Sequence, residues 1–312
     1  MFKTRGFKLL GLFATIALAI VLSACGNGGG SSSKDGNTSL GNKEIELPYI
    51  ASDNSAPRTL IIAEVLKKAG YDVTTTPVQA SGPLYASVAE NADSFHASGI
   101  FPSTDKSYYN QYKSKLSVYD KKNLVDDVKV GLAVPKYEQN IDSIADLKDS
   151  KKFDKEIQGT DARNGVMKQT KSELDEDNLD GYSLKESSDQ DQFKAVQKAY
   201  KQQQPILFTA MDSSWFSKEL GVKMLKDPDK IYGKEDQHIN LVFNKEFKAN
   251  HPAAYTIATR MSDDWSKKDE DQLAKKIFKD QKNPEQVAKD YVDDNDNKVD
   301  EWLEGCLLYT SD

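Results

Sequence analysis

Residues 128–135 read Val-Lys-Val-Gly-Leu-Ala-Val-Pro, and residues 238–243 read His-Ile-Asn-Leu-Val-Phe. Both runs are short and rich in β-branched and apolar residues, a composition typical of buried strands. Strand-like and helix-like segments alternate on both sides of each run. We therefore expect an α/β protein of two lobes, and we interpret the two runs as strands along which the chain crosses between the lobes.

The rest of the chain supports this division into lobes. Before residue 132 the expected strands lie at 44–50, 71–78 and 93–98, and the expected helices at 59–68, 84–90 and 107–115. The middle of the chain repeats this order, with strands at 156–159, 182–186 and 205–210 and helices at 144–148, 166–174 and 191–201. Such alternation predicts largely parallel sheets. We place the first lobe at 44–132 and 242–304, and the second lobe at 133–241.

Composition excludes several classes of function. The chain has 312 residues and a formal net charge of −7, so it lacks the basic surface that binding a nucleic acid requires. Its two cysteines and three histidines show neither the spacing of a metal site nor enough cysteine for a disulfide scaffold. No glycine-rich nucleotide-binding motif and no nucleophile-elbow motif occurs. We therefore expect a protein that has no cofactor and no metal and is not an enzyme.

The N-terminus is typical of an exported lipoprotein. Lys3, Arg5 and Lys8 precede an apolar run of 14 residues from Leu9 to Leu22, which is too short to span a bilayer comfortably but suits a signal peptide. The run ends in Leu-Ser-Ala-Cys, which resembles a bacterial lipobox. We predict that residues 1–24 are removed and that Cys25 carries lipid, so that the body of the protein is extracytoplasmic and held at the cell membrane.

Two further segments lie outside the expected folded body. Residues 25–43 are rich in Gly and Ser and are predicted to form a flexible tether. Residues 305–312, which include Cys306, resemble translated adaptor sequence, and we interpret them as a tail that is not native to the protein. We expect Cys306 to be neither a metal ligand nor a disulfide partner.

Several segments in the same order resemble the glycine betaine-binding (OpuAC-like) family of ABC-importer substrate-binding lipoproteins. The most similar are Gly131-Leu132-Ala133-Val134-Pro135-Lys136-Tyr137 and the following Asp142-Ser143-Ile144-Ala145-Asp146-Leu147-Lys148. Others are Phe101-Pro102-Ser103-Thr104-Asp105, Leu225-Lys226-Asp227-Pro228 and Lys298-Val299-Asp300-Glu301-Trp302. The resemblance covers about residues 44–304 and implies a type II periplasmic-binding-protein fold with two strand crossings.

The resemblance also implies a function and partners. A receptor of this family closes its lobes on a small zwitterion, such as glycine betaine or a related quaternary-amine osmolyte, and delivers it to an ABC permease driven by ATPase subunits. An exported hydrolase is a distant alternative, because the sequence shows no paired nucleophile and base.

The family binds the trimethylammonium head with a cage of tryptophans and the carboxylate with backbone amides at a helix start. Carried over residue by residue, the amides belong to Ser55 and Ala56, and the first two cage positions are Ile100 and Met211. The third is Trp265 or, because two extra residues stand in this segment, Asp263. Phe101 lies beside the first of these positions.

Two of the three cage positions are therefore not aromatic, which leaves the ligand open. Phe101, Tyr85 or Trp215 could complete the cage. Alternatively, nearby charged residues suggest a more polar solute, such as an amino acid; these residues are Asp53, Asp105, Asp161, Arg163, Asp212 and Asp263.

Overall fold

The computed structural model describes residues 38–148, 150–175 and 179–306, all within one unit of the chain. The predicted signal peptide and Cys25 lie outside these residues. None of the described helices is long and apolar enough to cross a membrane.

The first strands form as the alternating sequence predicts. Strand β1 (Glu44–Ile50) buries Ile45, Leu47 and Ile50, and it pairs in parallel with β2 (Asp72–Val78). Helix α1 (Ser55–Lys68) makes the crossover that a parallel pair requires. It begins four residues earlier than predicted from the sequence, and residues 55–63 of this helix are all buried.

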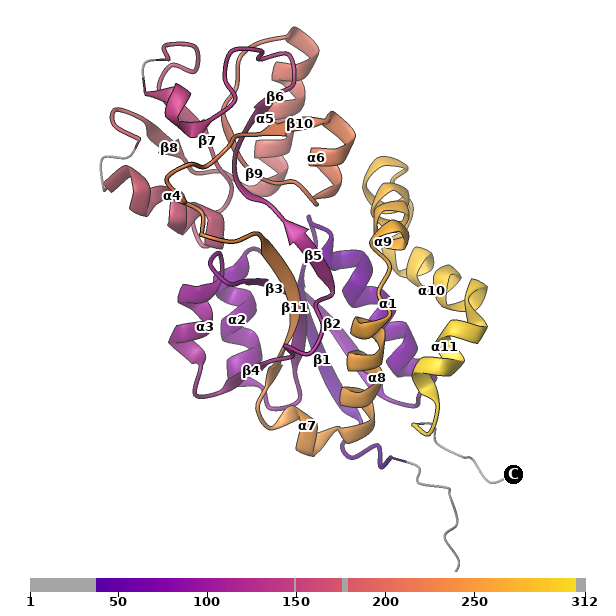
Figure 1. The fold of residues 1–312 in the computed structure, drawn as a ribbon. Coiled ribbons are helices and arrows are strands. Elements are labelled where there is room, and N and C mark those ends of the chain that lie inside the picture. The colour runs from indigo at the N-terminus through magenta and orange to yellow at the C-terminus, as the bar shows by residue number, and fades with distance from the viewer. Residues whose placement is uncertain (1–37, 149, 176–178, 307–312) are drawn as a thin grey trace, which may run out of the picture. The chain divides into compact units, whose positions relative to one another are not determined.

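A second sheet forms around the long strand β11 (Gln237–Asn244), which lies between several partners (Figure 1). All these partners run antiparallel to it, and they are β3 (Phe95–Phe101), β4 (Leu116–Val118) and β5 (Val125–Val128). A parallel bridge between Glu46 and Ser94 connects β1 to the start of this sheet.

The middle of the chain builds a third sheet in the order β10-β6-β9-β7-β8. Its strands are β6 (Val130–Pro135), β7 (Glu156–Gln158), β8 (Ser183–Lys185), β9 (Phe208–Met211) and β10 (Val222–Met224). Only the β7 pairings are parallel, whereas β6 runs antiparallel to both β9 and β10. The expectation of largely parallel sheets was wrong for both the second and the third sheet. Every partner of β11 runs antiparallel to it, and β6 enters the third sheet directly from β5, without a crossover helix.

The chain passes between sheets at two places. At Lys129 it leaves β5, which pairs with β11, and enters β6, which pairs with β9. The predicted crossing at 128–135 is therefore confirmed. The predicted second crossing at 238–243 was wrong, because all of β11 lies in the second sheet whereas β10 still belongs to the third. The chain instead returns through residues 225–236. Two separate hydrophobic clusters match this division, one around β1, β3 and β11 and the other around Leu132, Val134 and Ile157.

Helices cover these sheets (Figure 1). Those beside α1, in orange and yellow, are α8 (Pro252–Asp263), α9 (Lys267–Ala274), η2 (Lys275–Lys279), α10 (Pro284–Asp294) and α11 (Asp296–Leu303). The others are α2 (Ser81–Glu90), α3 (Lys106–Tyr112), η1 (Ile144–Leu147), α4 (Gly165–Asp175), α5 (Asp189–Gln202), α6 (Trp215–Leu220) and α7 (Phe247–Asn250). The sequence predicted neither α6 nor α7, since each is too short to show helical periodicity.

The chain near residue 305 packs onto the folded body. Cys306 is fully buried in the cluster that contains Leu303 and Trp302, and Arg260 donates a hydrogen bond toward its Sγ. The carbonyl of Gly305 accepts a hydrogen bond from the amide of Thr38 at 2.8 Å. Residues 307–312 of the predicted tail lie outside the described residues.

Candidate functional site

A cavity of about 540 Å³ lies where elements of the second and third sheets meet. The loop after β1, the end of β3 and helix η2 line it from one side, and α4, α5, β9 and α6 line it from the other. Its volume is within the range of small-molecule pockets, roughly 300–1,000 Å³. The lining is mostly apolar, with a few convergent polar groups, which is typical of a ligand site.

Of the residues predicted for the site, Ile100 and Met211 line this cavity. Ile100 lies near the end of β3 and Met211 at the end of β9, so the two sheets bring them to the same space. Trp215, named as a residue that could complete the cage, also lines it.

The other predicted residues lie behind the cavity wall. Ser55 and Ala56 are buried at the start of α1. Phe101 packs edge-on against Tyr109, with ring centroids 5.6 Å apart. The indole of Trp265 donates to Glu270 at 2.8 Å, so the polar edge of this ring faces away from any ligand.

The start of α1 already contains an anion. One carboxylate oxygen of Asp53 accepts the Ser55 amide at 2.7 Å, and the Asp53 carbonyl accepts the Ala56 amide at 3.1 Å. Asp53 lines the cavity. Burial raises its pKa to about 6, the nearby Asp189 adds to this shift, and Ser55 and Arg58 oppose it.

A second carboxylate faces the same cavity from α5. Asp189 accepts hydrogen bonds from the Ser52 hydroxyl at 2.7 Å and from the Asn164 amide at 3.3 Å. Asn164 also accepts the Ser81 amide at 3.1 Å. Burial raises the pKa of Asp189. These contacts connect α2 and the loop after β1 with α4 and α5.

Aromatic rings form one end of the cavity. Trp215 of α6 lies between Phe193 of α5 and Phe278 of η2, with ring centroids 4.8 and 5.0 Å away. All three line the cavity. The sequence singled out neither Phe193 nor Phe278 as a site residue, because no local pattern shows that α5 and η2 approach α6.

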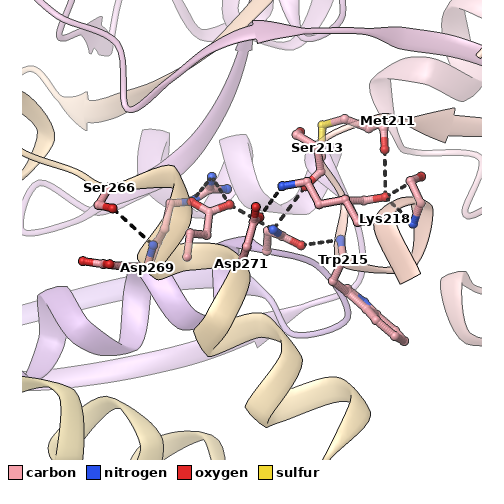
Figure 2. Close-up of polar contacts among 12 residues, drawn as sticks. Met211, Ser213, Trp215, Lys218, Ser266, Asp269 and Asp271 are labelled. Carbon is pink, nitrogen blue, oxygen red and sulfur yellow. Dashed lines mark hydrogen bonds and ion pairs between the residues drawn. The ribbon is translucent and has the colours of Figure 1, made fainter. Parts of the chain in front are cut away.

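A buried polar network lies beside this end. Arg58 and Glu270 form an ion pair at 3.1 Å, and both side chains are almost fully buried. Asn54 donates to Glu270 at 3.0 Å and to the Ser213 carbonyl at 3.3 Å, and it accepts the Trp215 amide at 2.8 Å. Figure 2 labels Ser213 and Trp215 of this network, together with Lys218 and Asp271, which form an ion pair beside it. The network connects α1 and α9 with the start of α6.

The remaining charged residues named from the sequence do not line the cavity. Asp105 is fully buried below it, where it accepts the Ile100 amide at 3.0 Å, and burial raises its pKa to about 7. Asp161 pairs with Arg163 at 2.6 Å, which lowers the pKa of Asp161. Asp212 accepts the Lys129 amide, and Asp263 accepts the Tyr119 hydroxyl. In the part of the chain that the structure describes, no group of three or more His, Cys, Asp or Glu could hold a metal ion.

Comparisons with known proteins agree on one family. Residues 43–294 match the family model described as the substrate binding domain of ABC-type glycine betaine transport systems. Over 117 residues the chain is 40% identical to the glycine betaine/carnitine transport binding protein GbuC of Listeria monocytogenes. That alignment spans 38% of this chain and 38% of the length of the Listeria protein.

Solved structures share the fold. The closed, liganded form of lactococcal OpuAC with glycine betaine has a TM-score of 0.75 and 28% identity, covering 84% of this chain and 99% of that one. The glycine betaine and L-proline-binding protein ProX of Borrelia burgdorferi has a TM-score of 0.77 and 24% identity, covering 83% and 96%. These matches confirm the predicted type II periplasmic-binding-protein fold.

Proposed function

The chain belongs to the family of substrate-binding domains of ABC-type glycine betaine transport systems, and from this premise we propose that it is the solute receptor of an ABC importer. In this role it captures a small solute with a quaternary-amine head and delivers it to a membrane permease driven by ATPase subunits. The family is one of transport receptors and not of enzymes.

The observation that carries this proposal is the position of the cavity. Its walls come from two sheets that each have a hydrophobic cluster of their own, and the chain passes between them at Lys129 and again at residues 225–236. We propose that the part of the chain built around β1, β3 and β11 and the part built around β6, β7 and β9 act as the two lobes, which close on the solute by a hinge motion.

The aromatic end of the cavity supports a quaternary amine. A fully substituted ammonium donates no hydrogen bond, so it is bound through aromatic faces, each contact contributing about 1–2 kcal/mol when desolvated. Trp215, Phe193 and Phe278 supply such rings here. Ile100 and Met211, which line the same cavity, add apolar surface for the methyl groups.

Binding of quaternary amines tests the proposal directly. Isothermal titration calorimetry with glycine betaine, carnitine and choline should show saturable binding of at least one compound. Trp215→Ala should weaken that binding about 5-fold to 30-fold, as expected for the loss of one aromatic contact of about 1–2 kcal/mol. Tyr137→Ala is a matched control, because this ring packs against Tyr200 and does not line the cavity. If none of the three compounds binds, the proposal is wrong.

We further propose that the receptor is extracytoplasmic and is held at the membrane through lipid on Cys25. The support is the order of basic residues, apolar run and Leu-Ser-Ala-Cys at the N-terminus. Expression of Cys25→Ala should release the protein from the membrane fraction or leave an unprocessed precursor. Ser23→Thr, which retains the cysteine, should still fractionate with membranes. A Cys25→Ala protein that is processed and stays membrane-bound contradicts the proposal.

A further inference from the structure

We propose that the cavity selects a quaternary-ammonium compound that carries one positive charge and no carboxylate, and that Asp53 determines this preference. The inference rests on the proposed function and names the ligand class of the same site. The proposed ligand class differs from the zwitterionic ligand that the sequence predicted.

The first argument is that the expected carboxylate-binding amides already have partners. The Ser55 amide donates to the carboxylate of Asp53, and the Ala56 amide donates to the Asp53 carbonyl. Both donor residues are buried, at 0% and 2% exposure, so a ligand in the cavity does not reach them. The Asp53 carboxylate thus occupies the position that a ligand carboxylate would take at the start of α1.

The second argument is the charge of the cavity wall. Asp53 lines it from the loop after β1 and Asp189 lines it from α5, and no Lys, Arg or His lines it within the described ranges 38–148, 150–175 and 179–306. The nearby Arg58 is buried, pairs with Glu270 at 3.1 Å and does not line the cavity. A ligand carboxylate would therefore face two like charges and no cation. A ligand with one positive charge would instead be attracted by both carboxylates.

The third argument is that the cavity combines these carboxylates with aromatic rings. Trp215, Phe193 and Phe278 line the same cavity as Asp53 and Asp189. The positively charged methyl groups of a quaternary ammonium can then contact the faces of the rings while the carboxylates balance its charge. The Asp53 carboxyl has a pKa raised to about 6 by burial, and a bound cation would relieve this penalty by favouring the ionised form.

The test compares three compounds that share the methylated ammonium head. Choline and tetramethylammonium each carry one positive charge, whereas glycine betaine adds a carboxylate. At pH 7.5, calorimetric titration of the wild-type protein should give a Kd for choline at least tenfold below that for glycine betaine. Tetramethylammonium should also bind more tightly than glycine betaine, which separates the effect of charge from that of the choline hydroxyl.

Asp53→Asn retains an oxygen that can accept the Ser55 amide but removes the charge. It should reduce the preference for choline over glycine betaine at least tenfold, and Asp189→Asn should shift the ratio in the same direction. Asp300→Asn, an equal change of charge at an exposed position on α11, should leave the ratio unchanged. Thermal unfolding of each variant checks that it folds. If Asp53→Asn does not fold, Asp189→Asn still tests the effect of charge.

The outcomes separate the two proposals. If glycine betaine binds the wild-type protein as tightly as choline or more tightly, or if neither Asp variant changes the ratio, the monocation preference is overturned and the receptor function stands. If no quaternary amine binds the wild-type protein, both proposals are overturned.

Discussion

The side chain of Asn54 accepts a hydrogen bond from the backbone amide of Trp215 at 2.8 Å, across 161 positions of sequence. The same side chain donates to Glu270 and to the Ser213 carbonyl. Asn54 directly precedes α1, and Trp215 opens α6 and lines the cavity, so this one residue connects the elements on both sides of the site.

Asn54→Ala should therefore weaken ligand binding. The variant loses hydrogen bonds that hold α1 and α6 together around the cavity, each contributing about 0.5–1.5 kcal/mol. We expect the Kd of the preferred quaternary amine to rise about tenfold, measured by calorimetry. Asn295→Ala is a matched control, because its side-chain amide donates only locally, to the Tyr291 carbonyl. An unchanged Kd in Asn54→Ala would show that these bonds do not contribute to the bound arrangement.

Glu270→Gln should destabilise the folded protein strongly. Glu270 accepts hydrogen bonds from Arg58, Asn54 and Trp265, and removing its charge leaves the buried guanidinium of Arg58 without a counter-ion. Breaking a buried ion pair costs about 3–5 kcal/mol. Urea unfolding measures this loss.

The matched control for this variant is Glu64→Gln. Glu64 pairs with Lys67 at 2.7 Å on the surface of α1, where the Lys67 side chain is 46% exposed. A surface pair contributes about 0–1 kcal/mol. If both variants lose the same small amount of stability, the buried network is not important for the fold.

Asp105→Asn should stabilise the protein, and more at pH 8 than at pH 5. Burial raises the pKa of Asp105 from 3.8 to about 7, so the folded state holds a proton that the unfolded state has lost. This difference in protonation stabilises the folded state fully below pH 4. The stabilisation then falls as pH rises from 4 through 7, by at most about 1.4 kcal/mol per pH unit. Asparagine does not ionise, so the Asp105→Asn protein does not lose stability in this way as pH rises.

Unfolding curves of both proteins from pH 5 to pH 8 check this prediction. The difference between variant and wild type isolates Asp105 from His96, whose pKa burial lowers to about 3 and whose effect has the opposite sign. A difference that does not grow with pH contradicts the assignment of Asp105 as a buried, protonated carboxyl.

Ile100→Trp combined with Met211→Trp should strengthen binding of a quaternary amine. Both residues line the cavity, so each replacement places a ring where the ammonium head can contact it. At about 1–2 kcal/mol for each contact, the double variant should bind at least tenfold more tightly. Each single variant serves as its control. Unchanged or weaker binding in the double variant would mean that these positions do not face the ammonium head.

Sequence order alone identified the family and most of the folded elements. Strand periodicity predicted β1 and β2 within one residue at each end, because the alternation of Ile45 and Leu47 with polar residues is a local property. The run at 128–135 likewise predicted the first passage between the sheets. Elements too short to show a local period could not be predicted in the same way, such as the six residues of α6 and the four residues of α7.

The sequence also indicated Ile100, Met211 and Trp215 as residues near a ligand, and all three line the cavity. Only the tertiary structure decided what surrounds them. Packing brings Phe278 and Asp189, which are 89 positions apart, to the same cavity, and it buries the Ser55 and Ala56 amides against Asp53. Charge at a site depends on which groups meet across the fold and on how far each is removed from water, and neither property can be read from neighbouring positions in a sequence.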